Sequence, residues 1–124
     1  MRLLLDTHLL LWALSEPKRV GREGLALIGR SDVYVSAASI WEISIKAAQG
    51  KLKASPETVL KGIEPAGFLM LPVTGDHAAR VFSLGTHHKD PFDRLLVAQA
   101  QLEAMTLLTN DDALAAYGNC VQVL

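Results

Sequence analysis

Short apolar segments alternate with longer helical segments from one end of this sequence to the other, and this alternation limits the possible fold most. Strands are predicted at residues 2–6, 32–36, 68–73, 105–110 and 120–124. Helices are predicted at residues 7–21 (ending near Pro17), 37–52, 55–67, 74–88, 90–104 and 111–118. Nearly continuous apolar strands are typical of a sheet that is buried on both faces. The pattern therefore predicts an α/β fold with three layers, in which a central, mainly parallel sheet lies between helices.

Composition limits the class of protein further. The 124 residues are half hydrophobic and no linker or repeat divides them, so we expect one domain over residues 1–124. The formal net charge is −1, so a site for a polyanion must be local. Cys120 is the single cysteine, which predicts a reducing, cytoplasmic setting. Asp6 and His8 interrupt the N-terminal apolar run, so neither a signal peptide nor a membrane span is expected.

Acidic residues recur where predicted strands end and where the following helices begin. Asp6 ends the first strand and Asp111 follows the fourth, while Glu42 and Asp93 lie near the starts of two helices. In parallel α/β sheets, ligands bind at the carboxyl ends of the strands. We therefore expect these four side chains at one edge of the sheet.

Two of these acids, and Asp90 as well, also have a purely structural interpretation as helix caps. Asp6 and Asp111 are each followed by a predicted helix, and Asp90 stands directly before Pro91. Aspartate is among the preferred N-cap residues, because its carboxylate accepts a hydrogen bond from the first helical turn. For Asp90, the cap is the simplest interpretation.

Glu42 and Asp93 differ in the helix faces on which they are predicted. Glu42 shares a face with Lys46 and Gln49, which is the polar side, and its spacing from Ser39 also fits a capping box. Asp93 could complement the helix dipole from the first turn. However, the residues four and seven positions after Asp93 are apolar, whereas a solvated acid is expected to face outward.

A cluster of four carboxylates would repel itself unless a cation were bound. Carboxylate oxygens suit hard divalent ions, so we predict Mg²⁺, with Mn²⁺ as a substitute. Zinc is disfavoured, since His87 and His88 are adjacent and no Cys/His pair has zinc-ligand spacing. His8 is predicted to be a polar neighbour of the site and His77 a surface helix residue.

Magnesium held by carboxylates commonly serves reactions at phosphorus. The sequence has neither a glycine-rich phosphate loop nor a nucleophile-elbow motif, so the expected substrate is a phosphodiester. Candidate phosphate contacts are Lys46, Lys51, Lys53 and Arg94. Lysines at helix ends are usually just solvated, and Arg94 is favoured because it is adjacent to Asp93 and arginine binds phosphate in a bidentate manner.

Four segments together resemble a known family over essentially the whole chain. "LLLDTHLLLWAL", "VSAASIWEISIKAAQGKL", "HHKDPFDRLLVAQAQ" and "LLTNDDALAAYG" are similar in order and spacing to PIN-domain ribonucleases, in particular the VapC toxins of bacterial toxin–antitoxin pairs. The resemblance implies that Asp6, Glu42, Asp93 and Asp111 are the catalytic metal ligands. It also implies a PIN-like α/β/α fold and Mg²⁺-dependent cleavage of RNA that leaves 5′-phosphate and 3′-hydroxyl ends. The implied partners are a second copy, in a homodimer, and a cognate antitoxin.

One departure from the family pattern is mild. The first motif often reads Asp-Thr-Asn in the family, whereas here it reads Asp-Thr-His. The hydroxyl of Thr7 still has the position from which it could orient a metal ligand. Contact of Asp90 with a metal through water is left open.

Two other functions compete with cleavage. A phosphoacceptor domain of the receiver or dehalogenase type also has an aspartate after its first strand. The dehalogenase pattern requires a second aspartate at the position of His8, and a receiver requires a lysine near the end of a late strand, which the segment 105–110 lacks. An RNA-binding module without activity would lack some of the acids, and all four are present.

Overall fold

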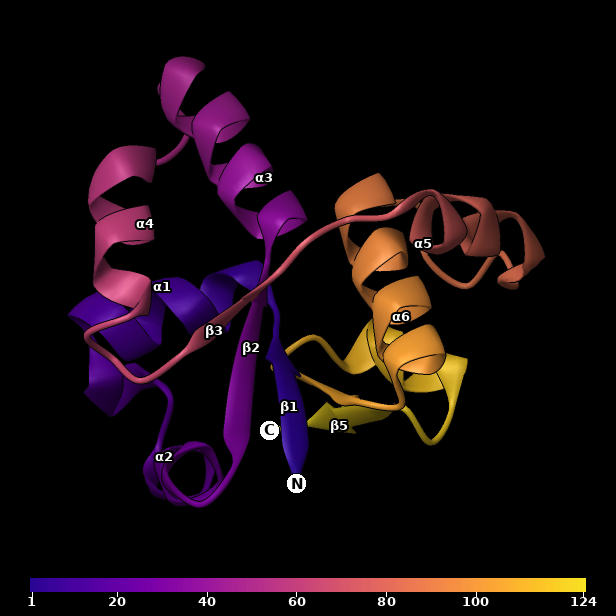
Figure 1. The fold of residues 1–124 in the computed structure, drawn as a ribbon, viewed down its shortest axis with the longest axis horizontal. Helices are drawn as coiled ribbons and strands as arrows, with labels where there is room; N and C mark the ends of the chain where they lie inside the picture. The colour runs from indigo at the N-terminus through magenta and orange to yellow at the C-terminus, as the bar shows by residue number, and fades with distance from the viewer.

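The computed structural model describes residues 1–124 and contains one five-stranded sheet (Figure 1). The strands are β1 (Arg2–Leu5), β2 (Asp32–Ser36), β3 (Leu69–Leu71), β4 (Thr106–Thr109) and β5 (Val121–Val123). Their order across the sheet is β3-β2-β1-β4-β5, and every neighbouring pair is parallel. The predicted α/β fold with a central parallel sheet is confirmed.

Helices cover both faces of the sheet. The α-helices are α1 (Thr7–Ser15), α2 (Arg22–Gly29), α3 (Ala37–Ala48), α4 (Pro56–Ile63), α5 (Gly75–Arg80) and α6 (Pro91–Glu103). Three 3₁₀ helices are η1 (Pro17–Arg19), η2 (Val81–Ser83) and η3 (Asp112–Tyr117). In Figure 1, α1, α2 and α4 lie on one side of the strands and α5 and α6 lie on the other. This arrangement is the predicted three-layer architecture.

Strand β1 occupies the centre of the sheet and shows why the two layers form. Successive side chains of a strand point to opposite faces. Leu3 and Leu5 therefore belong to the core beneath α1 to α4, whereas Leu4 belongs to the core beneath α6. All three leucines are fully buried. An apolar strand buried on both faces gives Asp6, the next residue, a rigid support.

Two helical segments differ from the prediction. No helix was predicted at α2, whose two glycines are poor helix formers. Gly24 is closely packed there: a Cβ atom would lie 2.7 Å from side-chain atoms of Val20 and Leu124, which would have to shift. The helix predicted at residues 74–88 ends at Arg80 and continues only as η2, and residues 84–90 form an irregular segment. Gly85, Thr86 and the adjacent histidines are weak helix formers, consistent with this early end.

The prediction that His77 is a surface residue is wrong, since its side chain is 2% exposed. The ring lies between α5 and α6, where Nε2 is 2.8 Å from Oε2 of Glu103. Nδ1 accepts the backbone N–H of Thr74, and the Thr74 hydroxyl accepts the N–H of His77 in return. His77 thus completes a capping box at the start of α5 and also contacts Glu103 of α6, a pairing that the sequence of α5 alone does not reveal. No helix in the chain has the combination of length and apolar character that a membrane span requires.

Candidate active site

A polar cavity of about 220 Å³ lies where β1 and β4 end and where α3 and α6 begin. None of the residues that line it is hydrophobic; they are Asp6, Thr7, His8, Glu42, Lys46, His88, Asp90, Asp93, Asn110 and Asp111. The structure thus brings together the four acids expected at the sheet edge. It also places Thr7, Asp90 and Lys46 beside them.

Asp6 is both a helix cap and part of this cavity. Its Oδ1 accepts the N–H of Leu9 at 2.8 Å and so caps α1, while Oδ2 accepts the hydroxyl of Thr109. Burial raises the pKa of this carboxyl, although the hydrogen bonds from Thr109 and Leu9 act in the opposite direction. Asp6 therefore caps α1 and also lines the cavity, so the structural interpretation does not exclude the functional one.

Glu42 is 3% exposed, although Gln49, on the polar helix face predicted for both residues, is exposed. The cap of α3 is Ser36, whose hydroxyl accepts the N–H of Ala38, and the proposed capping box with Ser39 does not form. The hydroxyl of Thr7 instead donates to Oε1 of Glu42 at 2.6 Å. Lys46 donates to Oε2, and this bond raises the pKa of the lysine.

Asp93 differs from the other acids of the cavity because its carboxylate accepts no hydrogen bond from the chain. Asp90, in contrast, accepts the N–H groups of Phe92 and Asp93 and caps α6. Burial raises the pKa of Asp93 to about 7, and repulsion by Asp90, Glu42 and Asp6 contributes in the same direction. His88 nearby lowers it only in part. Asp93 is thus a partly buried acid without a compensating donor.

Two residues at the site were not predicted to have a role there. Thr109 is fully buried, and its hydroxyl joins Asp6 to the backbone N–H of Asp111, which it accepts at 3.0 Å. His88 places Nε2 at 3.2 Å from Oδ2 of Asp111. Thr109 has a signal in the sequence, since it precedes the acidic turn at the end of β4. The position of His88 depends on an irregular segment and has no comparable signal.

The structure does not bring Arg94 into the cavity. One guanidinium nitrogen donates to the carbonyl of Val81, and Nε is buried without a partner. Adjacent helical residues point about 100° apart, which turns Arg94 toward η2 when Asp93 faces the site. Of the four basic candidates, only Lys46 lines the cavity, whereas Lys53 lines a different one.

The oxygen atoms that the cavity offers as metal ligands fit a hard divalent cation. Carboxylate oxygens are the ligands that Mg²⁺ and Mn²⁺ prefer, and Asp93 is available because nothing in the chain is bonded to it. The carboxylates of Asp93 and Asp111 also lie close together, with candidate ligand atoms within 4.8 Å. A cation would remove the mutual repulsion that raises the pKa of Asp93.

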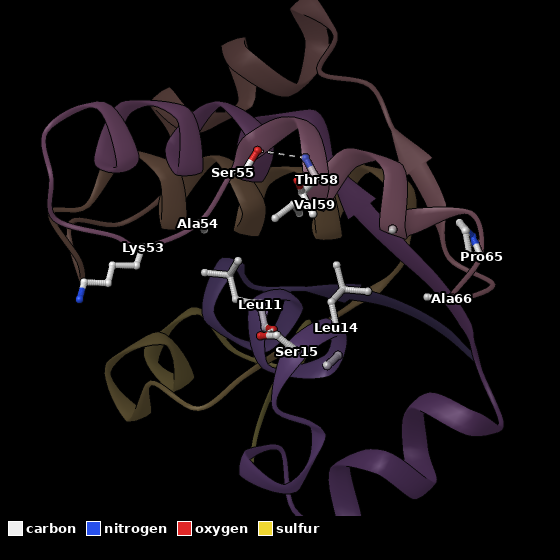
Figure 2. Close-up of a pocket in the computed structure, with 12 residues that line it drawn as sticks. Leu11, Leu14, Ser15, Lys53, Ala54, Ser55, Thr58, Val59, Pro65 and Ala66 are labelled. Atoms are coloured by element: carbon white, nitrogen blue, oxygen red, sulfur yellow. Dashed lines mark hydrogen bonds between the residues drawn. The ribbon is translucent and has the colours of Figure 1, made fainter.

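A larger cavity of about 570 Å³ lies between α1 and α4 and has a different character (Figure 2). Figure 2 shows Leu11 and Leu14 of α1 pointing toward Val59 of α4. Lys53 is its only charged lining residue, and no carboxylate reaches it. This cavity has no carboxylate, imidazole or thiol that could hold a metal ion, so the polar cavity is the candidate active site.

Comparison with known proteins agrees with the architecture. No curated protein sequence matches the chain. Among solved structures, VapBC2 from Rickettsia felis, bound to a DNA fragment from its promoter, is 17% identical with a TM-score of 0.73, and the match covers 100% of this chain and 98% of that chain. A toxin–antitoxin complex from Klebsiella pneumoniae is 22% identical with a TM-score of 0.66, covering 97% and 95%.

A third structure, FitAcB from Neisseria gonorrhoeae, is 25% identical with a TM-score of 0.61, and the match covers 96% of this chain and 95% of that chain. The sequence itself matches the PIN domain family over residues 3–119. That range includes Asp6, Glu42, Asp93 and Asp111, the four acids predicted to form the site. The chain therefore belongs to the PIN domain family.

Proposed function

We propose that this protein is a VapC-like toxin that cleaves RNA with the help of a divalent cation. The observation that carries the proposal is the convergence of Asp6, Glu42, Asp93 and Asp111 on one polar cavity, with Asp93 lacking any hydrogen-bond donor. These acids are the positions that the family resemblance assigns to catalysis. The similar fold of the toxin–antitoxin complex from Klebsiella pneumoniae supports the toxin class.

The four acids would hold Mg²⁺, for which Mn²⁺ would substitute. A bound magnesium ion supplies positive charge against phosphate oxygens and acidifies the attacking water. The chain's own contribution is to keep the carboxylates in place before the substrate arrives. Asp6 is fixed by its cap and by Thr109, and Glu42 is fixed by Thr7. Preorganised groups of this kind lose no free energy to reorientation during the reaction.

Lys46 is the proposed contact for the substrate phosphate. It lies in the cavity wall with its amine bonded to Glu42, and its side chain is 36% exposed. A cation bound by Glu42 would compete for that carboxylate and leave the amine free for a phosphate oxygen. Thr7 and Asp90 then support the site without touching the substrate, Thr7 through Glu42 and Asp90 through the start of α6.

The proposed partners are a cognate antitoxin, a second copy of the chain and RNA, all in the cytoplasm. The similar fold of a toxin–antitoxin complex supports the antitoxin as a partner. An apolar depression lined by Trp41, Val81 and Phe92 supports the homodimer. Phe82, which follows Val81 in the sequence, is 96% exposed, which is unusual for a large apolar side chain unless a partner covers it.

The proposal is tested by incubating labelled structured RNA with the wild type and with Asp6→Asn, in Mg²⁺ and in EDTA. Asparagine caps helices about as well as aspartate, so the fold should persist. Cleavage should be lost in Asp6→Asn and in EDTA, and the products should end in 5′-phosphate and 3′-hydroxyl. Asp112→Asn is the matched control, since Asp112 is exposed and lies outside the cavity. Cleavage that persists in EDTA, or equal cleavage by the wild type and Asp6→Asn, would contradict the proposal, as would RNA binding without cleavage.

A further inference from the structure

His88 occupies the acidic cavity in a way that the family motif does not explain. It lies in the irregular segment between η2 and α6, with a side chain that is 18% exposed. Its Nε2 is 3.2 Å from Oδ2 of Asp111 and 3.6 Å from Oδ2 of Asp93. By distance alone, these three side chains could share a metal ion. Whether His88 would be a ligand depends on which ring nitrogen carries the proton.

The other ring nitrogen determines that proton's position. Nδ1 of His88 lies 3.1 Å from the backbone nitrogen of Asp90 and accepts its N–H. A nitrogen that accepts a hydrogen bond carries a lone pair there, so the ring proton is on Nε2. A protonated Nε2 has no lone pair to offer a cation. With this bond intact, His88 is therefore a hydrogen-bond donor to Asp111.

Asp111 is held in place less by packing than Asp93 or Glu42 is. Its side chain is 43% exposed, compared with 21% for Asp93 and 4% for Glu42. Oδ1 accepts the N–H of Ala113 and caps η3, which leaves Oδ2 to be oriented. The Nε2–H of His88 is the only side-chain donor to that oxygen. It connects the end of β4 to the start of α6, which carries Asp93.

From this geometry we infer that His88 is a positioning residue, which holds the carboxylate of Asp111 in the cavity through Nε2–H and does not ligate the cation. The inference rests on the proposed function for the role of Asp111 as a metal ligand. Groups that orient metal ligands by hydrogen bonding typically change metal affinity by about 10- to 100-fold when they are removed. The segment 88–93 thus links these groups. The backbone N–H of Asp90 orients the imidazole of His88, and the side chain of Asp90 caps the helix that carries Asp93. The imidazole in turn orients Asp111.

The tautomer is tested first, in protein without metal. Long-range ¹H–¹⁵N spectra of ¹⁵N-labelled protein distinguish a protonated Nε2 from a protonated Nδ1, and the spectrum of His88→Ala assigns the signals of His88. We expect the proton on Nε2 and no change of tautomer when Mg²⁺ is added. A proton on Nδ1, or the loss of the Nε2 proton with Mg²⁺, would overturn the inference.

The second test measures Mn²⁺ affinity by calorimetry in the wild type, His88→Ala, Asp111→Asn and the double variant. If His88 acts through Asp111, His88→Ala should weaken binding by about 10-fold or more in the wild type but have little further effect in Asp111→Asn. His88→Gln, which keeps an N–H near the same place, should restore most of the affinity. The control is His87→Ala, since the His87 ring packs against Tyr117 and lines another cavity.

The outcomes separate this inference from the proposed function. Equal losses from His88→Ala in both backgrounds, or no loss in either, would overturn the positioning role while leaving the metal site intact. Imidazole nitrogen coupling in the electron-spin-echo spectrum of bound Mn²⁺, present in the wild type and absent in His88→Ala, would show direct ligation instead. A wild type that binds no Mn²⁺ would overturn both the inference and the proposed function.

Discussion

Replacement of Asp93 by asparagine is expected to stabilise the metal-free protein above neutral pH, although Asp93 lines the candidate active site. The carboxylate of Asp93 is partly buried, is close to other acids and accepts no hydrogen bond from the chain. Asparagine has nearly the same shape and no charge. The substitution therefore removes repulsion and desolvation and breaks no hydrogen bond, and the attraction to His88 that it also removes is smaller than the effect of burial.

The magnitude follows from the pKa shift. The pKa of Asp93 is raised from 3.8 to about 7, mainly by burial and next by repulsion from Asp90. Each pKa unit corresponds to 1.36 kcal/mol, so the ionised side chain destabilises the folded state by at most about 4 kcal/mol. Between about pH 4 and pH 7 the folded protein binds a proton that the unfolded chain has released, so stability falls as the pH rises through this window.

The assay is urea unfolding of the wild type and Asp93→Asn in EDTA at several pH values. The variant should be more stable by up to about 4 kcal/mol at about pH 8.5, and the difference should shrink below about 1 kcal/mol at about pH 4. Added Mn²⁺ should stabilise the wild type, by about 2.7 kcal/mol at 100 times the dissociation constant, but not the variant. A variant that is less stable than the wild type at the alkaline pH, or a difference that does not change with pH, would refute this reasoning.

Three further substitutions test other parts of the structure. Thr7→Val should lower the free energy of unfolding by about 1–3 kcal/mol in urea titrations, because the buried Glu42 loses a donor; unchanged stability would contradict that role. Arg94→Gln should leave cleavage of RNA unchanged, since the guanidinium is bonded to Val81 outside the cavity, and a large loss of cleavage would restore the predicted phosphate contact. Phe82→Glu should shift the protein from dimer to monomer in light scattering at micromolar concentration, and a wild type that is already monomeric would remove the homodimer.

Much of the fold could be predicted because its signals are local. The leucines of β1 and the acid that follows them indicate a buried strand and a polar strand end within six residues. The cap at Asp90 before Pro91 is equally local, and the structure has it. Helix α2 is not predicted, because glycine disfavours a helix and the reason for Gly24 is its close packing against Leu124, at the opposite end of the chain. Such a contact is visible only after the chain has folded.

The candidate site was predictable in its acids but not in the groups that hold them. The periodicity of α3 alone puts Glu42 on a polar face, whereas in the structure Glu42 is buried and bonded to Thr7, which comes from another element. His88 was considered only as a zinc ligand, since its place beside Asp111 is determined by the path of an irregular segment. Residue types at strand ends thus predict where chemistry occurs, whereas their hydrogen-bond partners follow from tertiary packing.

The most direct test of the central claim is to locate Mn²⁺ by anomalous diffraction in crystals of the wild type soaked with the ion. The claim is that the polar cavity at the ends of β1 and β4 is a divalent-cation site built from Asp6, Glu42, Asp93 and Asp111. We predict an anomalous peak in that cavity, in contact with Asp93 and absent from crystals of Asp93→Asn. No peak among these acids in a crystal whose cavity is open to solvent, or a peak that persists in Asp93→Asn, would contradict the account.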